Sequence, residues 1–441
     1  MMIILMMMFF SIFSIYLVNN KILNKMLLLL INKIFIFFFL KVSLFKFNFN
    51  LIYFNNFGVD KISYSLIFLM IWMFFLMLMS MEKLMNKLIY NLVVFMMMFL
   101  YLTFFSLNLM FFFIFFESSM ILMMLMIVGW GYQIERIQAS FYMILYTLVS
   151  SLPMLMVLLN LYNYNFYSLS FFLILNKMIY MNLINFILLI FIFLVKFPMF
   201  LFHIWLPKAH VEAPVFGSMI LASILLKLAG YGLMRLLMMM MNFVNKMNYL
   251  IFSVCLIGMV YLSMLCLRQF DMKILVAYSS IVHMCMVILG IMVMNYSGFM
   301  GGMYLMLGHG LTSSSLFVLV NFCYERLGSR SMLIVKGLMS LFPSMSMWWF
   351  LMIVSNFSSP PSINLVGEIF VLIGILSKNL LFFLVMFPMF LGVFYSLYLY
   401  TFSNHGKLNN KISKNNNIKE FLLMNFHWIP MNYLILNLYL Y

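Results

Sequence analysis

Four ionisable side chains lie in stretches of sequence that are otherwise almost entirely apolar: Glu117, Lys196, Lys227 and Glu368. A charge at the middle of a bilayer costs at least about 2.5–3.5 kcal/mol, so such residues generally face a cavity or a charged partner and serve a transport pathway. Desolvation destabilises the charged form of a carboxylate or an ammonium group, which brings both closer to exchanging protons near neutral pH. The pattern therefore indicates proton transfer through an apolar interior.

Two histidines, His283 and His309, lie in later apolar stretches, and imidazole also exchanges protons near neutral pH. A carboxylate close to Lys196 would hold a proton on its ammonium group, and moving that carboxylate away would release the proton. Glu117 is our candidate for this carboxylate. The predicted relay runs through Lys196, Lys227 and either His283 or His309, and it ends near Glu368.

The alternative is that these groups only hold helices together. Glu117 and Lys196 could form a purely structural ion pair, and a lone His often does no more than hydrogen-bond a neighbour. Lys196 stands close to Pro198, however, where a helix is expected to break. Because a broken helix suits movement better than fixed packing does, we favour the transport interpretation.

The composition of the chain shows in which solvent its elements fold. Of the 441 residues 67% are hydrophobic and only 8% are charged, and the mean hydropathy is +1.14. Soluble domains are about 45–50% apolar and about 25% charged. Apolar stretches of about 20 residues, the length with which a helix crosses a bilayer, recur along the whole chain. The sequence predicts an all-α polytopic membrane protein.

Hydropathy windows of about 19 residues indicate 14 transmembrane helices, and two of these contain an interruption. Lys196-Phe197-Pro198 lies inside the seventh helix and Ser359-Pro360-Pro361 inside the twelfth. Such breaks survive in lipid where protein or a water-lined cavity satisfies the freed backbone groups. The expected helices lie near residues 2–18, 26–45, 63–80, 88–107, 109–130, 139–161, 180–203, 215–240, 247–267, 273–294, 299–323, 335–375, 379–402 and 421–440.

Amino-acid usage indicates a mitochondrial gene. The chain has 52 Met and 53 Phe but only six Ala and five Arg, so residues with AT-rich codons are enriched. So many Met residues favour a genetic code with a second Met codon, as in animal mitochondria. Residues 1–18 also lack the Arg-rich character of a transit peptide. We therefore expect a multi-pass protein of the mitochondrial inner membrane.

The formal net charge of +16 comes from basic residues scattered between the apolar segments. They do not gather on one soluble face, which argues against a nucleic-acid partner. Sorted by side, fourteen Lys and Arg residues of the loops fall on one side of the membrane and six on the side of the termini. Since basic loops prefer the inner side, the termini are predicted to face the intermembrane space.

Motifs for cofactors are missing from the sequence. It has no P-loop and no G-x-G-x-x-G after a strand. The cysteines stand singly in apolar stretches without a C-x-x-C, so neither an iron–sulfur cluster nor a zinc site is expected. We therefore predict that the chain itself binds no cofactor and no metal.

Distinctive motifs fill the region from about 110 to 370. The most specific one runs from His203 to Pro214 and reads HIWLPKAHVEAP. WGYQIER precedes it at 130–136, and GHGLTSS follows at 308–314. These motifs resemble those of the subunit-4 family of mitochondrial NADH:ubiquinone oxidoreductase, respiratory complex I. Residues 1–90 and 400–441 show little beyond hydrophobicity.

The resemblance implies an antiporter-like fold of 14 helices with two inverted repeats of five helices each. Three helices in residues 1–87 would precede the first repeat at 88–240. The second repeat would occupy 247–402, and a polar loop and the last helix would fill 403–441.

The resemblance also implies roles for the buried charges. The essential carboxylate of the family falls on Glu117, its pumping lysine on Lys196 and its bridging lysine on Lys227. Its relay histidines and its distal exit carboxylate fall on His283, His309 and Glu368.

A chain of this family would be a proton-pumping module of a larger enzyme. Partner subunits would oxidise NADH, reduce ubiquinone and hold the FMN and the iron–sulfur clusters. Other membrane-arm subunits, including antiporter-like ones, and phospholipid would surround it. Two other functions share much of this pattern, namely a cation/proton antiporter subunit and a purely structural membrane-arm subunit. The mitochondrial composition argues against the first of these, and the buried charges argue against the second.

Overall fold

The computed structural model is helical throughout its described part, which comprises residues 57–81, 87–163, 182–378, 380–407 and 416–436. Within these ranges there is no strand, only two isolated β-bridges. Nine helices of the described part are long and apolar enough to cross a membrane. The predicted all-α membrane class is thus confirmed. The count of 14 helices stays a prediction, because the first two, near 2–18 and 26–45, lie outside the described residues.

Polar residues stand at the N-terminal ends of several apolar helices in the first half of the chain. Asn108 and Asn182 precede α5 and α7 with extended backbone, and they are residue types favoured at this position. The elements are α3 (Lys61–Ser80), α4 (Lys87–Phe105), α5 (Leu109–Trp130), α6 (Arg136–Asn163), α7 (Leu183–Lys196), α8 (Trp205–Glu212), α9 (Val215–Ile220), the π-helical turn η4 (Leu221–Leu225) and α10 (Leu226–Met239).

Polar residues also stand at the N-terminal ends of helices in the second half of the chain. Asp271 and Asn295 precede α12 and α13, and Gly328 ends α13 in the left-handed region at φ 68°, where glycine is favoured. The elements are α11 (Met241–Cys266), α12 (Met272–Met292), α13 (Tyr296–Leu327), α14 (Leu338–Leu341), α15 (Pro343–Asn356), α16 (Ile363–Lys378), the 3₁₀ helix η5 (Leu380–Val385), α17 (Met386–Asn404) and α18 (Ile418–Tyr433).

Both predicted interruptions are present. α7 ends at Lys196, so the seventh helix stops short of the predicted residue 203, and the separate helix α8 follows from Trp205. Pro198 explains the stop, because proline offers no backbone N–H and clashes with the preceding turn. In the twelfth predicted helix, α15 ends at Asn356 and α16 begins at Ile363.

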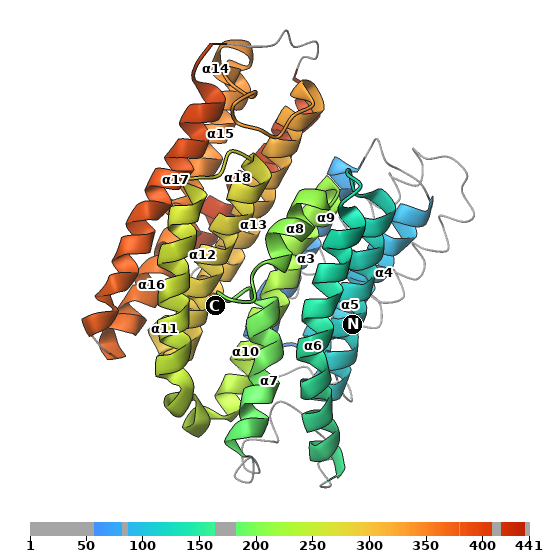
Figure 1. Cartoon of the computed structure of the whole chain (residues 1–441), viewed down its shortest axis with the longest axis vertical. Coiled ribbons are helices and arrows are strands. Elements are labelled where there is room, and N and C mark those ends of the chain that lie inside the picture. The colour runs from blue at the N-terminus through green and yellow to red at the C-terminus, as the bar shows by residue number, and fades with distance from the viewer. Residues whose placement is uncertain (1–56, 82–86, 164–181, 379, 408–415, 437–441) are drawn as a thin grey trace.

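The helices form an elongated bundle with buried helices at its centre. Figure 1 shows α10 and α13 in the middle of the molecule, α4–α6 on one side and α15–α17 on the other. An 18-residue window of α13, and another across α9, η4 and α10, is entirely buried. The outer helix α6 instead exposes Phe141, Leu145 and Val149. An apolar outer surface of this kind suits a lipid solvent.

Candidate functional site

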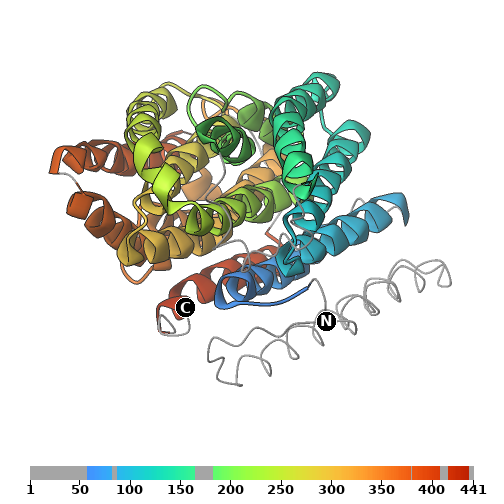
Figure 2. The same cartoon turned by 90° about the horizontal axis from the view of Figure 1, so that it is seen from below.

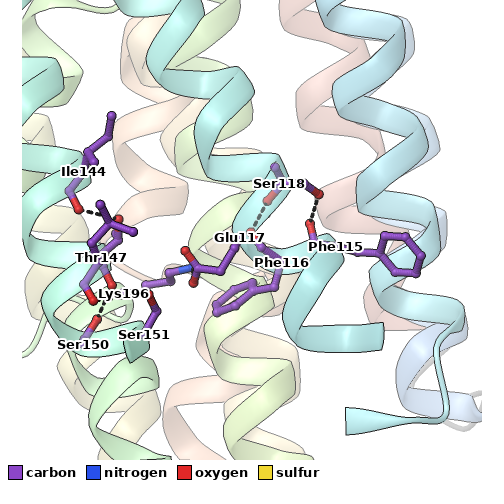
Figure 3. A network of polar contacts seen from close by, with 11 residues as sticks. Phe115, Phe116, Glu117, Ser118, Ile144, Thr147, Ser150, Ser151 and Lys196 are labelled. Atoms are coloured by element: carbon purple, nitrogen blue, oxygen red, sulfur yellow. Dashed lines mark hydrogen bonds and ion pairs between the residues drawn. The ribbon is translucent and has the colours of Figure 1, made fainter. Parts of the chain in front are cut away.

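Glu117 and Lys196 form an ion pair between α5 and the last residue of α7. The Lys196 ammonium nitrogen Nζ lies 2.7 Å from Glu117 Oε1 and donates a hydrogen bond to it. Lys196 is fully buried, and its Nζ lies 3.4 Å from the centre of the Phe116 ring. Figure 3 shows the two side chains meeting beside this ring. The buried ammonium is therefore held by a carboxylate and by an aromatic face.

The break after α7 explains how Lys196 comes to this place. Because the helix ends there, its final carbonyl groups have no partner within the helix. Trp205 Nε1 donates a hydrogen bond of 3.1 Å to Val195 O, and Met199 N donates one of 3.1 Å to Leu194 O. The freed backbone groups are thus satisfied by the segment after the break, as a membrane interior requires.

Hydroxyl groups of α6 stand beside the ion pair, although they were not among the predicted site residues. Figure 3 shows Thr147, Ser150 and Ser151 next to Lys196 and Glu117. Their hydroxyl groups donate to carbonyl groups of α6 itself, at distances of 2.8–3.3 Å. Three hydroxyl residues at spacings of three and four share one helix face, and this spacing was the available signal.

Lys227 lies at the start of α10, directly after the π-helical turn. Its Nζ lies 2.5 Å from Ala222 O in that turn and 2.9 Å from Nδ1 of His309 on α13. Both side chains are buried, with exposed fractions of 0% and 2%. A distance of 2.9 Å is that of a hydrogen bond, so a direct hydrogen bond joins Lys227 to His309.

His283 lies next to His309, and Glu368 lies next to His283. The rings of His283 and His309 have centroids 5.6 Å apart, and His283 Nδ1 lies 3.7 Å from Glu368 Oε1. The structure therefore brings four of the six predicted residues into one cluster, Lys227, His309, His283 and Glu368. The other two, Glu117 and Lys196, form a second cluster. Among the described residues no hydrogen bond joins the two clusters.

His210 is another buried ionisable group that the prediction did not include. It lies on α8, its ring stacks on Phe317 with centroids 4.5 Å apart, and it is fully buried. Neither of its ring nitrogens has a hydrogen-bond partner among the described residues. It belongs to the HIWLPKAHVEAP motif, which was the signal in the sequence.

Metal binding has no support in the described residues. No group of three or more His, Cys, Asp or Glu side chains there could hold a metal ion. The four cysteines are free and buried. That the chain binds no cofactor stays a prediction.

Comparisons with known proteins decide the family. Residues 106–395 match the family described as NADH:quinone oxidoreductase/Mrp antiporter, TM, and residues 1–108 match NADH-ubiquinone oxidoreductase chain 4, amino terminus. The chain is 46% identical over 402 residues to NADH-ubiquinone oxidoreductase chain 4 of Ceratitis capitata, covering 88% of this chain and 90% of that protein. The chain belongs to the family of NADH-ubiquinone oxidoreductase chain 4. As a member it is an antiporter-like, proton-translocating membrane subunit of that oxidoreductase.

Further relatives and solved structures agree with this family. Chain 4 of Locusta migratoria is 44% identical over 396 residues, covering 86% of this chain and 87% of that protein. A chain of respiratory complex I from Thermus thermophilus with bound NADH aligns with a TM-score of 0.87 at 20% identity, covering 97% of this chain and 94% of that chain. A chain of the Mrp complex from Dietzia sp. aligns with a TM-score of 0.84 at 14% identity. The alignment covers 92% of this chain and 80% of that chain. At these identities the likeness shows a shared antiporter-like fold.

Proposed function

We propose that this chain 4 protein moves protons through the two clusters of buried ionisable residues. The observation that carries the proposal is their position at irregular points of the helices. Lys196 ends α7 at the first break, Lys227 follows the π-helical turn, and Glu368 follows the second break. Interrupted helices and π-turns are frequent at transport and other functional sites.

Proton release begins at Lys196 in this proposal. The 2.7 Å contact with Glu117 stabilises the ammonium form of Lys196. When the contact opens, the fully buried ammonium loses its counter-ion, and the cost of keeping an unpaired charge in the interior drives the proton away. Because Lys196 ends a broken helix, the segment after it offers a place where the backbone can move.

The second cluster then carries the proton onwards. Lys227 exchanges a proton with His309 across 2.9 Å, and His283 stands between His309 and Glu368. Transfer between Lys196 and Lys227 requires water or side-chain movement, since no described hydrogen bond joins them. Glu368 is the last group in this route and is where the proton leaves the cluster.

We place the two inverted repeats at 88–240 and 247–402, so that the route crosses from the first repeat to the second at the contact between Lys227 and His309. Each range contains one broken helix, α7–α8 in the first and α15–α16 in the second. Paired interruptions in corresponding positions of two repeats are typical of transporters. The helices in 1–87 and the segment 403–441 lie outside the repeats in this division.

Partner subunits supply the redox chemistry in this proposal. They oxidise NADH, reduce ubiquinone and hold the FMN and iron–sulfur clusters, and this chain binds no cofactor. Its neighbours are other membrane-arm subunits of complex I, including antiporter-like ones, together with phospholipid of the mitochondrial inner membrane. Large apolar side chains exposed on α6 and α17 offer a surface for them. The excess of basic residues in the opposite loops supports termini in the intermembrane space.

The Glu117→Gln and Lys196→Ala variants test the route in the assembled complex. Each removes one charge of the ion pair, so we expect proton uptake per NADH and the coupled turnover to fall strongly in both. Proton uptake into sealed inner-membrane vesicles and NADH:ubiquinone turnover are measured on the same preparation. Glu135→Gln, the same change on an exposed carboxylate of the α5–α6 turn, is the control and keeps full activity. Full pumping in both test variants would leave only a structural role for the pair.

A further inference from the structure

A small cavity lies beside Glu368, between α11, α12, α16, α17 and the end of α15. Its volume is about 30 Å³. Its lining includes four polar side chains and Gly392 of the outer helix α17. The polar lining residues are His283, Asn356, Glu368 and Tyr395.

Tyr395 turns a polar group inwards from a helix that is otherwise mostly at the surface. Only a third of an 18-residue window of α17 is buried, yet Tyr395 is 1% exposed. A Cβ atom placed on Gly392 would lie 3.6 Å from the Tyr395 hydroxyl oxygen. The hydroxyl therefore stands next to the open space over Gly392, on the cavity side of α17. A buried tyrosine hydroxyl usually has a hydrogen-bond partner.

The contact between His283 and Glu368 also lacks a direct hydrogen bond. Nδ1 and Oε1 are 3.7 Å apart, beyond the range of about 2.7–3.2 Å for an N–H···O bond. A polar contact longer than about 3.5 Å often contains a bridging water. A buried site binds water when it offers more than about 10–15 Å³ and two to four polar partners, and this cavity meets both conditions.

We propose that the cavity binds a water molecule between His283 and Glu368, and that Tyr395 and Asn356 hold this water in place. The proposal rests on the proton route given above and adds a group that closes its step from His283 to Glu368. Tyr395 acts as a positioning residue: its O–H donates to the water oxygen. The side-chain amide of Asn356 supplies a further hydrogen bond.

The proton step through this water is balanced. The imidazolium of His283 gives its Nδ1 proton to the water oxygen, while one O–H bond of the same water breaks and its proton joins the Glu368 carboxylate. A neutral imidazole, an intact water and a neutral carboxyl group result. One proton has moved, and no other reactant is needed.

Two variants of the assembled complex test the water site in different ways. Tyr395→Phe removes the hydroxyl and keeps the ring. Gly392→Ala leaves every polar group in place but puts a methyl group into the cavity. This methyl lies 3.6 Å from the Tyr395 hydroxyl oxygen, an ordinary contact distance. We expect both to lower the kcat of NADH:ubiquinone turnover by about fivefold, the effect of losing one net hydrogen bond of about 1 kcal/mol. The KM values for NADH and ubiquinone stay unchanged, and the solvent deuterium isotope effect rises.

Tyr398→Phe is the matched control, because it makes the same change on α17 at a tyrosine whose ring packs on Phe402 outside the cavity. We expect it to keep the kcat and the isotope effect of the unmodified complex. A density map of the complex that resolves ordered water should show a water in contact with Tyr395, and Gly392→Ala should remove it.

The outcomes separate this proposal from the route on which it rests. Normal kcat and isotope effect in both variants would overturn the water site, as would a density map without a water at Tyr395. If Glu368→Gln still stops proton pumping in that case, the route stands and only the water is wrong. If Glu368→Gln pumps normally, the route itself is wrong.

Discussion

At the scale of single residues, the two buried lysines have different partners. Lys196 has a counter-ion, the Glu117 carboxylate, and an aromatic face next to it. Lys227 instead contacts the carbonyl oxygen of Ala222 and the imidazole of His309, both of which are uncharged groups when His309 is neutral. In the proposed route Lys196 therefore keeps its proton until its pair opens, and Lys227 passes a proton to a neighbour.

Lys227→Arg tests whether Lys227 must give up its proton. A guanidinium keeps the positive charge and donates hydrogen bonds, but it does not lose its proton in proteins. We expect turnover and proton pumping to fall at least about tenfold, which corresponds to about 1.4 kcal/mol on the activation free energy. The amount of assembled complex on a native gel should change much less than the turnover.

The control for this change is Lys208→Arg on α8. Lys208 Nζ lies 3.7 Å from the centre of the Tyr142 ring, and an arginine makes the same kind of cation–π contact. It should leave turnover unchanged. A Lys227→Arg complex with normal turnover would show that positive charge at this position suffices, without proton release.

At the scale of elements, glycines bring α13 and α16 unusually close. A Cβ on Gly301 would lie 2.6 Å from the backbone nitrogen of Val371, and one on Gly367 would lie 2.8 Å from that of Leu305. Small residues serve this purpose in membrane helices. α13 carries His309 and α16 carries Glu368. Their close approach therefore also fixes the distance between these two helices of the second cluster.

Gly301→Ala should therefore push the two helices apart. The added methyl meets backbone atoms that cannot rotate away, and overpacking of a tight interior typically costs about 1–3 kcal/mol. We expect less assembled complex and a lower thermal midpoint, and the remaining complex should turn over more slowly. Gly129→Ala on α5 is the control, since its added Cβ would meet no atom of another element within 4 Å. Equal stability of the two variants would contradict the close packing inferred for Gly301.

The same element scale shows what a sequence can and cannot predict. The charged groups and the two breaks were found in advance, because a Lys or a Pro-Pro in an apolar run is a local signal. The helix α8 was not expected: its eight residues include Pro207, Lys208 and His210, and a 19-residue hydropathy window averages over them. The Lys227–His309 contact joins residues 82 positions apart. It depends on how two helices rotate against each other, which no local pattern specifies.

At the scale of the whole molecule, the first and last described helices close the bundle together. Figure 2 shows α3 and α18 side by side along one face. Trp72 Nε1 on α3 donates a hydrogen bond of 2.8 Å to Phe426 O on α18, and the two rings meet edge to face. An ion pair between Asp60 and Arg235 ties the start of α3 to α10. Helices outside the two proposed repeats thus fasten one repeat to the other.

The Arg326–Glu420 ion pair is the point at which this closure can be tested. Arg326 in the last turn of α13 pairs with Glu420 in the first turn of α18, and the side chains are 5% and 15% exposed. Removing one member of a buried pair leaves an uncompensated charge, which costs about 3–5 kcal/mol, whereas replacing both by apolar groups is often neutral. Arg326→Met and Glu420→Met should therefore each lower the thermal midpoint and the yield of assembled complex.

The double variant decides whether these losses come from the pair itself. If α18 is held to α13 by the ion pair, Arg326→Met with Glu420→Met should be more stable than either single variant, because no unpaired charge remains. Turnover per assembled complex should stay normal in all three, since neither residue contacts the two clusters of buried ionisable residues. Losses that simply add in the double variant would show that the two side chains stabilise the bundle independently, and α18 would then be held mainly by its contacts with Trp72 and Phe75.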